Sequence, residues 1–159
     1  MSFCRLAGYG KKEEILGQNV GVLMPELYRE SHREFMRMAT QRVREDGLSA
    51  KDRQVFCCHT SGYVFPVWLQ LKFLVTVMNV HLFVGSFKIE KRLVNAKVAH
   101  LLVGPDKTIA EISSSCMTLL DLNLEKVQKR RNKVHIAELA PDIFDDRFEK
   151  KRSLPIVFY

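Results

Sequence analysis

The densest group of chemically capable side chains in this sequence is Cys57-Cys58-His59, where two thiols and an imidazole are neighbours. Cysteine and histidine are preferred zinc ligands, and a closed zinc site takes four of them. The flanking residues favour a β-strand, whose successive side chains point to opposite faces, so only Cys57 and His59 share a face. Two ligands are too few unless Cys4 or Cys116 joins them, and no C-x-x-C pair occurs. We therefore expect no metal site, and we expect one of the adjacent thiols to fill the core.

Active-site motifs are missing from the sequence. It contains no phosphate-binding G-x-x-x-x-G-K-[ST], no zinc-protease H-E-x-x-H and no nucleophile elbow G-x-S-x-G. The acids Asp142, Asp145 and Asp146 stand near an expected helix start, where carboxylates stabilise the positive end of the helix dipole. The sequence therefore predicts a protein that is not an enzyme and has no catalytic residues.

The positive charge is concentrated in the middle of the chain. The 159 residues carry a net charge of +7, and residues 51–97 hold seven basic side chains against two acidic ones, Asp52 and Glu90. A surplus confined to one β-rich segment indicates a sheet face that meets an acidic protein, and we do not expect nucleic acid as a partner. Lys126–Lys133 adds five basic residues in eight. Within it Lys129, Arg130 and Arg131 are candidate partner-binding residues, and the alternative is a solvated basic loop.

The composition predicts a folded intracellular chain. It is 47% hydrophobic and 27% charged, which is enough apolar side chain for a core. The longest apolar stretch, 64–87, is interrupted by polar residues such as Gln70 and Lys72, so we expect no transmembrane segment. The first ten residues lack the apolar run of a signal peptide, and the cysteines form no framework pattern. We expect a cytoplasmic location, with association with the cytoskeleton or a membrane left open.

Hydrophobic periodicity predicts an α+β fold. Residues 1–26 favour short helical turns, and 27–45 has the three- and four-residue spacing of a helix that begins after Pro25. Strands follow at 53–60, 63–77 and 80–89, with connections short enough for antiparallel pairing. After a basic linker, 98–103 and 108–112 form a second pair of expected strands, and 116–122 is an expected helix.

The strand at 63–77 is apolar on both faces, which predicts that both faces are covered. We expect Phe65, Val67 and their neighbours to face the long helix. The opposite face holds Trp68 and Lys72, and we expect these two residues to bind a partner protein, because aromatic anchors are common in interfaces. Cover by 119–127 or by the C-terminal residues of the same chain is the alternative.

Residues 6–90 resemble a PAS sensory domain. Three pieces in a fixed order carry the resemblance, namely Gly8-Tyr9 with 13–25, the helix-forming stretch 28–35, and 61–67 leading to 84–87. Residues 99–116 look like the opening hairpin and first helix of another PAS repeat, and 136–144 continues it. Such tandem repeats are similar to those of large signalling proteins of eukaryotic microbes, some of them multi-pass membrane proteins.

The resemblance also implies an incomplete pair of repeats. Residues 1–92 form a repeat without its first hairpin, and 98–159 form the start of a second repeat. We therefore expect an antiparallel PAS-type sheet with short helices on one face, in a permuted arrangement where 98–112 pairs beside 80–89. That pairing would cover an open sheet edge, which proteins avoid. The alternative is that the missing strands come from a neighbouring chain.

PAS domains hold haem, flavin or small metabolites, so the resemblance raises the question of a cofactor. In flavin-binding members a reactive cysteine follows a Gly-x-Asn pattern, whereas here Gly17-Gln18-Asn19 is followed by Val20. Haem needs an axial ligand, and His32 in the long helix is the candidate, although a histidine packed in the core is the simpler interpretation. We expect no cofactor, with haem or a small metabolite left open.

These expectations combine into a non-catalytic PAS-type sensory or protein-interaction module of a signalling protein or larger assembly. Two alternatives remain. One is a purely structural component of a large cytoskeletal or membrane-associated complex. The other is a regulator that binds a small ligand or haem and controls an effector elsewhere in the parent chain.

Overall fold

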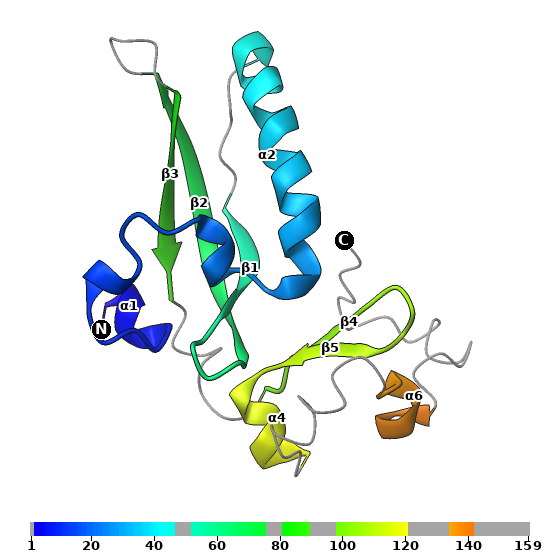
Figure 1. The fold of residues 1–159 in the computed structure, drawn as a ribbon. Coiled ribbons are helices and arrows are strands. Elements are labelled where there is room, and N and C mark those ends of the chain that lie inside the picture. The colour runs from blue at the N-terminus through cyan, green and yellow to red at the C-terminus, as the bar shows by residue number, and fades with distance from the viewer. Residues whose placement is uncertain (1, 47–51, 76–80, 90–97, 121–133, 142–159) are drawn as a thin grey trace.

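The computed structural model describes residues 2–46, 52–75, 81–89, 98–120 and 134–141, and it confirms an α+β fold (Figure 1). The other residues, among them the strand-to-strand connection at 76–80 and the linker at 90–97, lie outside the described parts. The elements in chain order are α1 (Phe3–Leu6), η1 (Lys12–Glu14), η2 (Val20–Leu23), α2 (Glu26–Asp46), β1 (Arg53–Cys58), β2 (Val64–Val75), β3 (His81–Lys88), β4 (Leu101–Val103), β5 (Ile109–Ile112), α4 (Ser114–Leu119) and α6 (Ile136–Leu139).

The three long strands form an antiparallel sheet in the order β1-β2-β3, which confirms the predicted pairing. The register places Phe65 opposite Cys57 and Trp68 opposite both Gln54 and Lys88. Strand β3 begins its pairing with β2 only at Trp68, so Pro66 lies where the described part of β2 has one neighbour, β1. A proline without an N–H is tolerated there, because no second ladder needs that donor.

The first core lies on the Phe65 face of this sheet. Its buried members are Ala7, Leu23, Cys57, Phe65 and Val67. The chain from α1 to η2 covers them, because the half-buried residues packed on this core include Phe3, Leu6, Tyr9, Ile15 and Val22. Among the described side chains, the buried members of this core come from α1 to η2 and from β1 and β2, and the long helix was expected on the same face.

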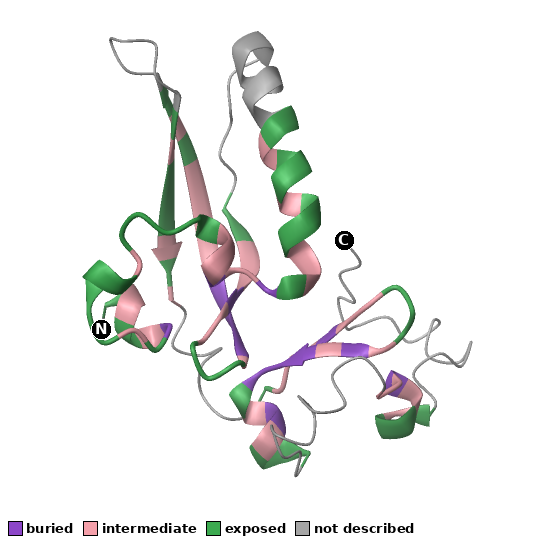
Figure 2. Cartoon of the chain, viewed as in Figure 1, coloured by how far each residue is buried: buried purple, intermediate pink, exposed green. Residues whose placement is uncertain are grey.

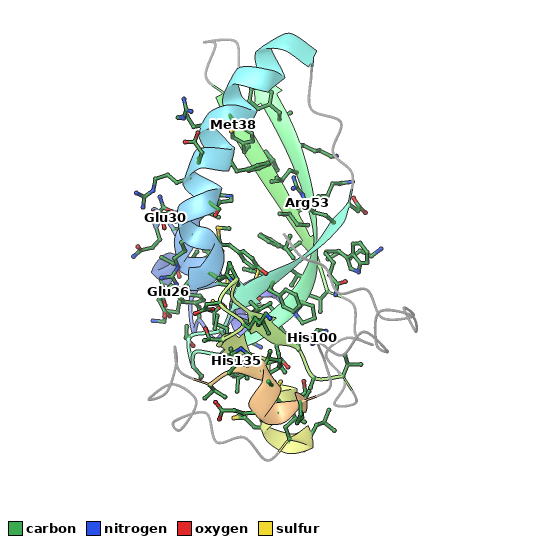
Figure 3. The ribbon with its side chains drawn as sticks, turned by 90° about the vertical axis from the view of Figure 1, so that its right-hand side faces the viewer. Glu26, Glu30, Met38, Arg53, His100 and His135 are labelled. Atoms are coloured by element: carbon green, nitrogen blue, oxygen red, sulfur yellow. The ribbon has the colours of Figure 1, made fainter. Side chains whose placement is uncertain are left out.

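Helix α2 lies next to β1 (Figures 1 and 3) and contacts it from the Phe65 face, because Arg53 alternates with Val55 and Cys57 onto that face. Its apolar stripe is only partly buried, since Phe35 and Met38 are each 42% exposed. The guanidinium of Arg53, at the start of β1, lies 5.5 Å from the centre of the Phe35 ring, a cation–π contact between strand and helix. The predicted helix is therefore present close to the expected bounds, and its contact with Arg53 lies on the Phe65 face.

The second sheet corrects the predicted permuted arrangement. Strands β4 and β5 pair with each other as a separate antiparallel hairpin. In the part of the chain that the structure describes, 98–112 does not pair with β3. The physical reason is that the hairpin has its own core, in which Ile109, Ile112, Cys116 and Ile136 are buried between β5, α4 and α6. The open side of β5 is also used, because the Ile109 N–H donates to the Val134 carbonyl at 2.8 Å.

Two small cores are therefore joined in one chain. Figure 2 shows burial concentrated where the lower end of the first sheet approaches β5, and mostly exposed or half-buried residues in the upper described parts of β2 and β3. Among the described residues, no helix has the length and apolar character that a membrane span requires.

Candidate docking surface on the Trp68 face

The face of the first sheet opposite its core is here called the Trp68 face. Strand alternation and register assign it rows of residues that lie side by side, from Cys58 and Val64 at the lower end to Leu74 and Leu82 at the upper end. The intermediate rows hold Phe56 with Pro66, Gln54 with Trp68 and Lys88, Gln70 with Ser86, and Lys72 with Val84.

The lower rows are covered by the β4–β5 hairpin of the same chain. The ring of Phe56 meets the His100 ring edge to face, with centroids 5.3 Å apart. Val64, only 1% exposed, forms a parallel β-bridge with Ser113 directly after β5. The alternative to a partner was cover by 119–127 or by the C-terminal residues of the same chain. At this end of the face, the intramolecular cover comes from the β4–β5 hairpin. Leu119 and Leu120 are exposed, and 121–127 and 142–159 lie outside the described residues.

The upper rows form an exposed apolar surface, here called the open patch, which consists of Lys72, Leu74, Leu82 and Val84. Leu74, Leu82 and Val84 are 50%, 45% and 40% exposed. They are neighbours across the β2–β3 ladder, because Leu74 is paired with Leu82 and Lys72 with Val84. Contiguous exposed apolar side chains mark interaction sites more often than isolated ones do.

The charge around the open patch is positive. Lys72 and Lys88 are both exposed on this face. The Asp52 carboxylate lies beside the Gln70 row, where it accepts a hydrogen bond from the Gln70 amide at 3.0 Å. An apolar centre with two exposed lysines on the same face suits an amphipathic partner that carries carboxylates.

The sequence identified part of this surface. Trp68 and Lys72 share the face, with Trp68 half-buried at the boundary between covered and open rows. Leu74, Leu82 and Val84 were not selected, although their alternation with Phe73 and Phe83 was a signal that could have found them. Lys129, Arg130 and Arg131 lie outside the described residues.

His32, the candidate haem ligand, lies half-buried on α2 with its ring 6.2 Å from the Phe35 ring. Burial, and then the nearby Arg53 charge, lower the pKa of its imidazole. The neutral ring is therefore favoured, which a metal ligand and a packed histidine equally require. Its described neighbours are the Phe35 ring and the Arg53 cation.

The adjacent cysteines point to opposite faces, as the strand alternation predicts. Cys57 is 3% exposed in the first core, whereas Cys58 is half-buried on the Trp68 face. Burial, with a smaller contribution from Cys58, raises the pKa of the Cys57 thiol to about 12. Among the described residues, no three His, Cys, Asp or Glu side chains come together in a way that could hold a metal ion.

We expect Cys57 to resist alkylation by N-ethylmaleimide at pH 8 in the folded chain, because the thiolate is the reactive form and burial disfavours it. Cys58 should react faster, since it is only half-buried. The raised pKa also means that the Cys57 contribution to stability is complete below about pH 9 and falls by about 1.4 kcal/mol per pH unit above it. Mass mapping of the modified thiols tests the order, and a faster reaction at Cys57 would contradict it.

Comparisons with known proteins add one partial similarity. A stretch of 96 residues, 57% of this chain, is 36% identical to a probable serine/threonine-protein kinase of Dictyostelium discoideum. The match spans only 6% of that protein's length. No family model matches the chain, and no solved structure matches it.

Proposed function

We propose that this chain is a non-catalytic, PAS-type protein-interaction module that docks a partner through the open patch of the Trp68 face. The observation that carries the proposal is the exposed apolar cluster of Leu74, Leu82 and Val84 beside Lys72. The partner we propose is a protein segment with apolar side chains for the centre of the patch and carboxylates for its lysine margin.

The arrangement of the chain supports an interaction role. The two cores are small, and the upper described parts of β2 and β3 extend beyond them with Leu74, Leu82 and Val84 exposed (Figure 2). The similarity of a short stretch to a much longer protein also suits a module within a larger chain. The PAS resemblance of residues 6–90 remains part of the proposal and gives the expected class of module.

Site-specific photo-crosslinking tests the docking surface. We expect a benzophenone amino acid at Val84 to give a crosslinked adduct of defined mass in an extract of the cells that make the protein. The matched control places the same group at Leu16, which is 68% exposed and belongs to the segment between η1 and η2. Lys72→Glu should reduce the Val84 adduct several-fold, because it reverses the charge at the margin. Equal adducts at both positions, or none at Val84, would refute the proposal.

A further inference from the structure

The β4–β5 hairpin occupies one half of the surface whose other half is open. On the covered half, two strands of the first sheet, β1 and β2, and the helix α2 each contact the hairpin. Phe56 of β1 meets His100, Val64 of β2 bridges Ser113, and Glu26 of α2 meets Glu111. The two halves of the chain otherwise have separate cores, so these contacts hold the hairpin against the Trp68 face.

Glu111 is the centre of this contact. It is 5% exposed, and its Oε1 accepts a hydrogen bond from the Glu26 N–H at 2.9 Å. Glu26 is the first residue of α2, so the carboxylate satisfies a helix N–H that has no partner within the helix and stabilises the positive end of its dipole. The same oxygen lies 3.9 Å from the Cys58 thiol, which donates to it. One side chain of β5 thus joins the long helix and the Trp68 face.

We propose that the β4–β5 hairpin is an autoinhibitory latch fastened by Glu111. Closed, it covers Phe56, Cys58 and Val64 and leaves the open patch as the only exposed apolar part of the described Trp68 face. Released, it exposes the lower rows and extends the docking surface along the full length of the strands. The inference rests on the proposed docking role of this face, although opening of the hairpin is measurable without any partner.

The test follows the Cys58 thiol in the full chain. Cys58 is half-buried in the closed state and reacts there at a basal rate with N-ethylmaleimide, so the increase above that rate reports how often the hairpin leaves the face. Glu111→Ala removes a charge-assisted hydrogen bond and should raise this rate about ten-fold or more. Glu111→Gln keeps an acceptor oxygen without the charge and should give a smaller increase. Hydrogen exchange of the β4 and β5 amides must stay slow in both variants, because the hairpin should detach as a folded unit.

The matched control is Glu138→Ala. Glu138 is also a capping carboxylate of the second half, since its Oε1 accepts a hydrogen bond from the His135 N–H at 3.1 Å. In the described contacts it does not touch the first sheet. An equal rise in Cys58 reactivity in this variant, an unchanged rate in Glu111→Ala, or loss of hairpin amide protection together with Cys58 protection would each overturn the latch.

The photo-crosslink at Val84 separates this inference from the proposed function. If the Trp68 face docks a partner and the hairpin restricts that docking, the adduct yield should be several-fold higher in Glu111→Ala than in the unmodified chain. Absence of an adduct in both chains refutes the docking role, while the Cys58 rate still decides whether the hairpin opens. A fast Cys58 with an unchanged adduct yield overturns the autoinhibitory role and leaves the docking role standing.

Discussion

Replacing Phe65 by alanine should lower the free energy of unfolding by about 3–5 kcal/mol. Phe65 is 7% exposed in the first core, and its ring lies 6.4 Å from the Phe3 ring, centroid to centroid. The substitution removes most of a buried aromatic side chain from a core with few members, so the cavity has little to refill it. Because domains of this size are stable by only about 5–15 kcal/mol, the loss takes a large part of the total.

Urea unfolding followed by Trp68 fluorescence measures this change, since Trp68 is the one tryptophan in the sequence. Phe83→Ala is the matched control. Phe83 is half-buried at the upper end of β3, where its ring meets Phe73 edge to face at 5.2 Å, outside both cores. We expect it to cost less than half as much as Phe65→Ala. Equal losses would show that the upper strands and the first core are one packed unit.

Gly8→Ala should also be strongly destabilising, because two separate costs fall on one residue. Gly8 has a φ of +84°, and an L side chain there costs about 1–2 kcal/mol. A Cβ would also lie 2.6 Å from the His59 ring atoms and closer still to the Thr60 hydroxyl. This is where the loop after α1 is tied to β1, since the Thr60 N–H donates to the Ala7 carbonyl at 2.9 Å. We expect the clash to raise the total loss above about 2 kcal/mol.

Gly17→Ala separates the clash from the backbone cost. Gly17 has a similar φ of +79°, but a Cβ there would meet nothing within 4 Å. Only the conformational cost of about 1–2 kcal/mol should appear in its unfolding curve. If the two alanine variants lose equal stability, the close approach of Gly8 to His59 and Thr60 does not contribute.

Local periodicity was enough to place the elements. The expected helix at 27–45 is α2 (Glu26–Asp46), and the expected strands at 53–60, 63–77 and 80–89 correspond to β1, β2 and β3 in the described residues. These elements have strong local signals, namely a proline at the helix start, period-two alternation and short connections. The first short helices are also present as α1, η1 and η2.

Packing between the elements was not predictable in the same way. The sequence placed the 98–112 hairpin beside β3, whereas in the described residues β4 and β5 pair with each other. An apolar stripe on a helix indicates that something covers it without naming the cover. In this chain the segment from α1 to η2 packs on the buried Cys57 and Phe65, and α2 contacts the same face at Arg53.

The amino-acid sequence by itself determined which residues share the Trp68 face and that Cys57 and Cys58 point apart, because strand alternation is a local property of the backbone. Only the tertiary structure decided which rows of that face are covered. Contacts between residues far apart in the chain, such as Glu26 with Glu111 and Phe56 with His100, bury the lower rows. The upper rows stay open because the described part of the hairpin ends before it reaches them, and the candidate function therefore depends on where two distant segments meet.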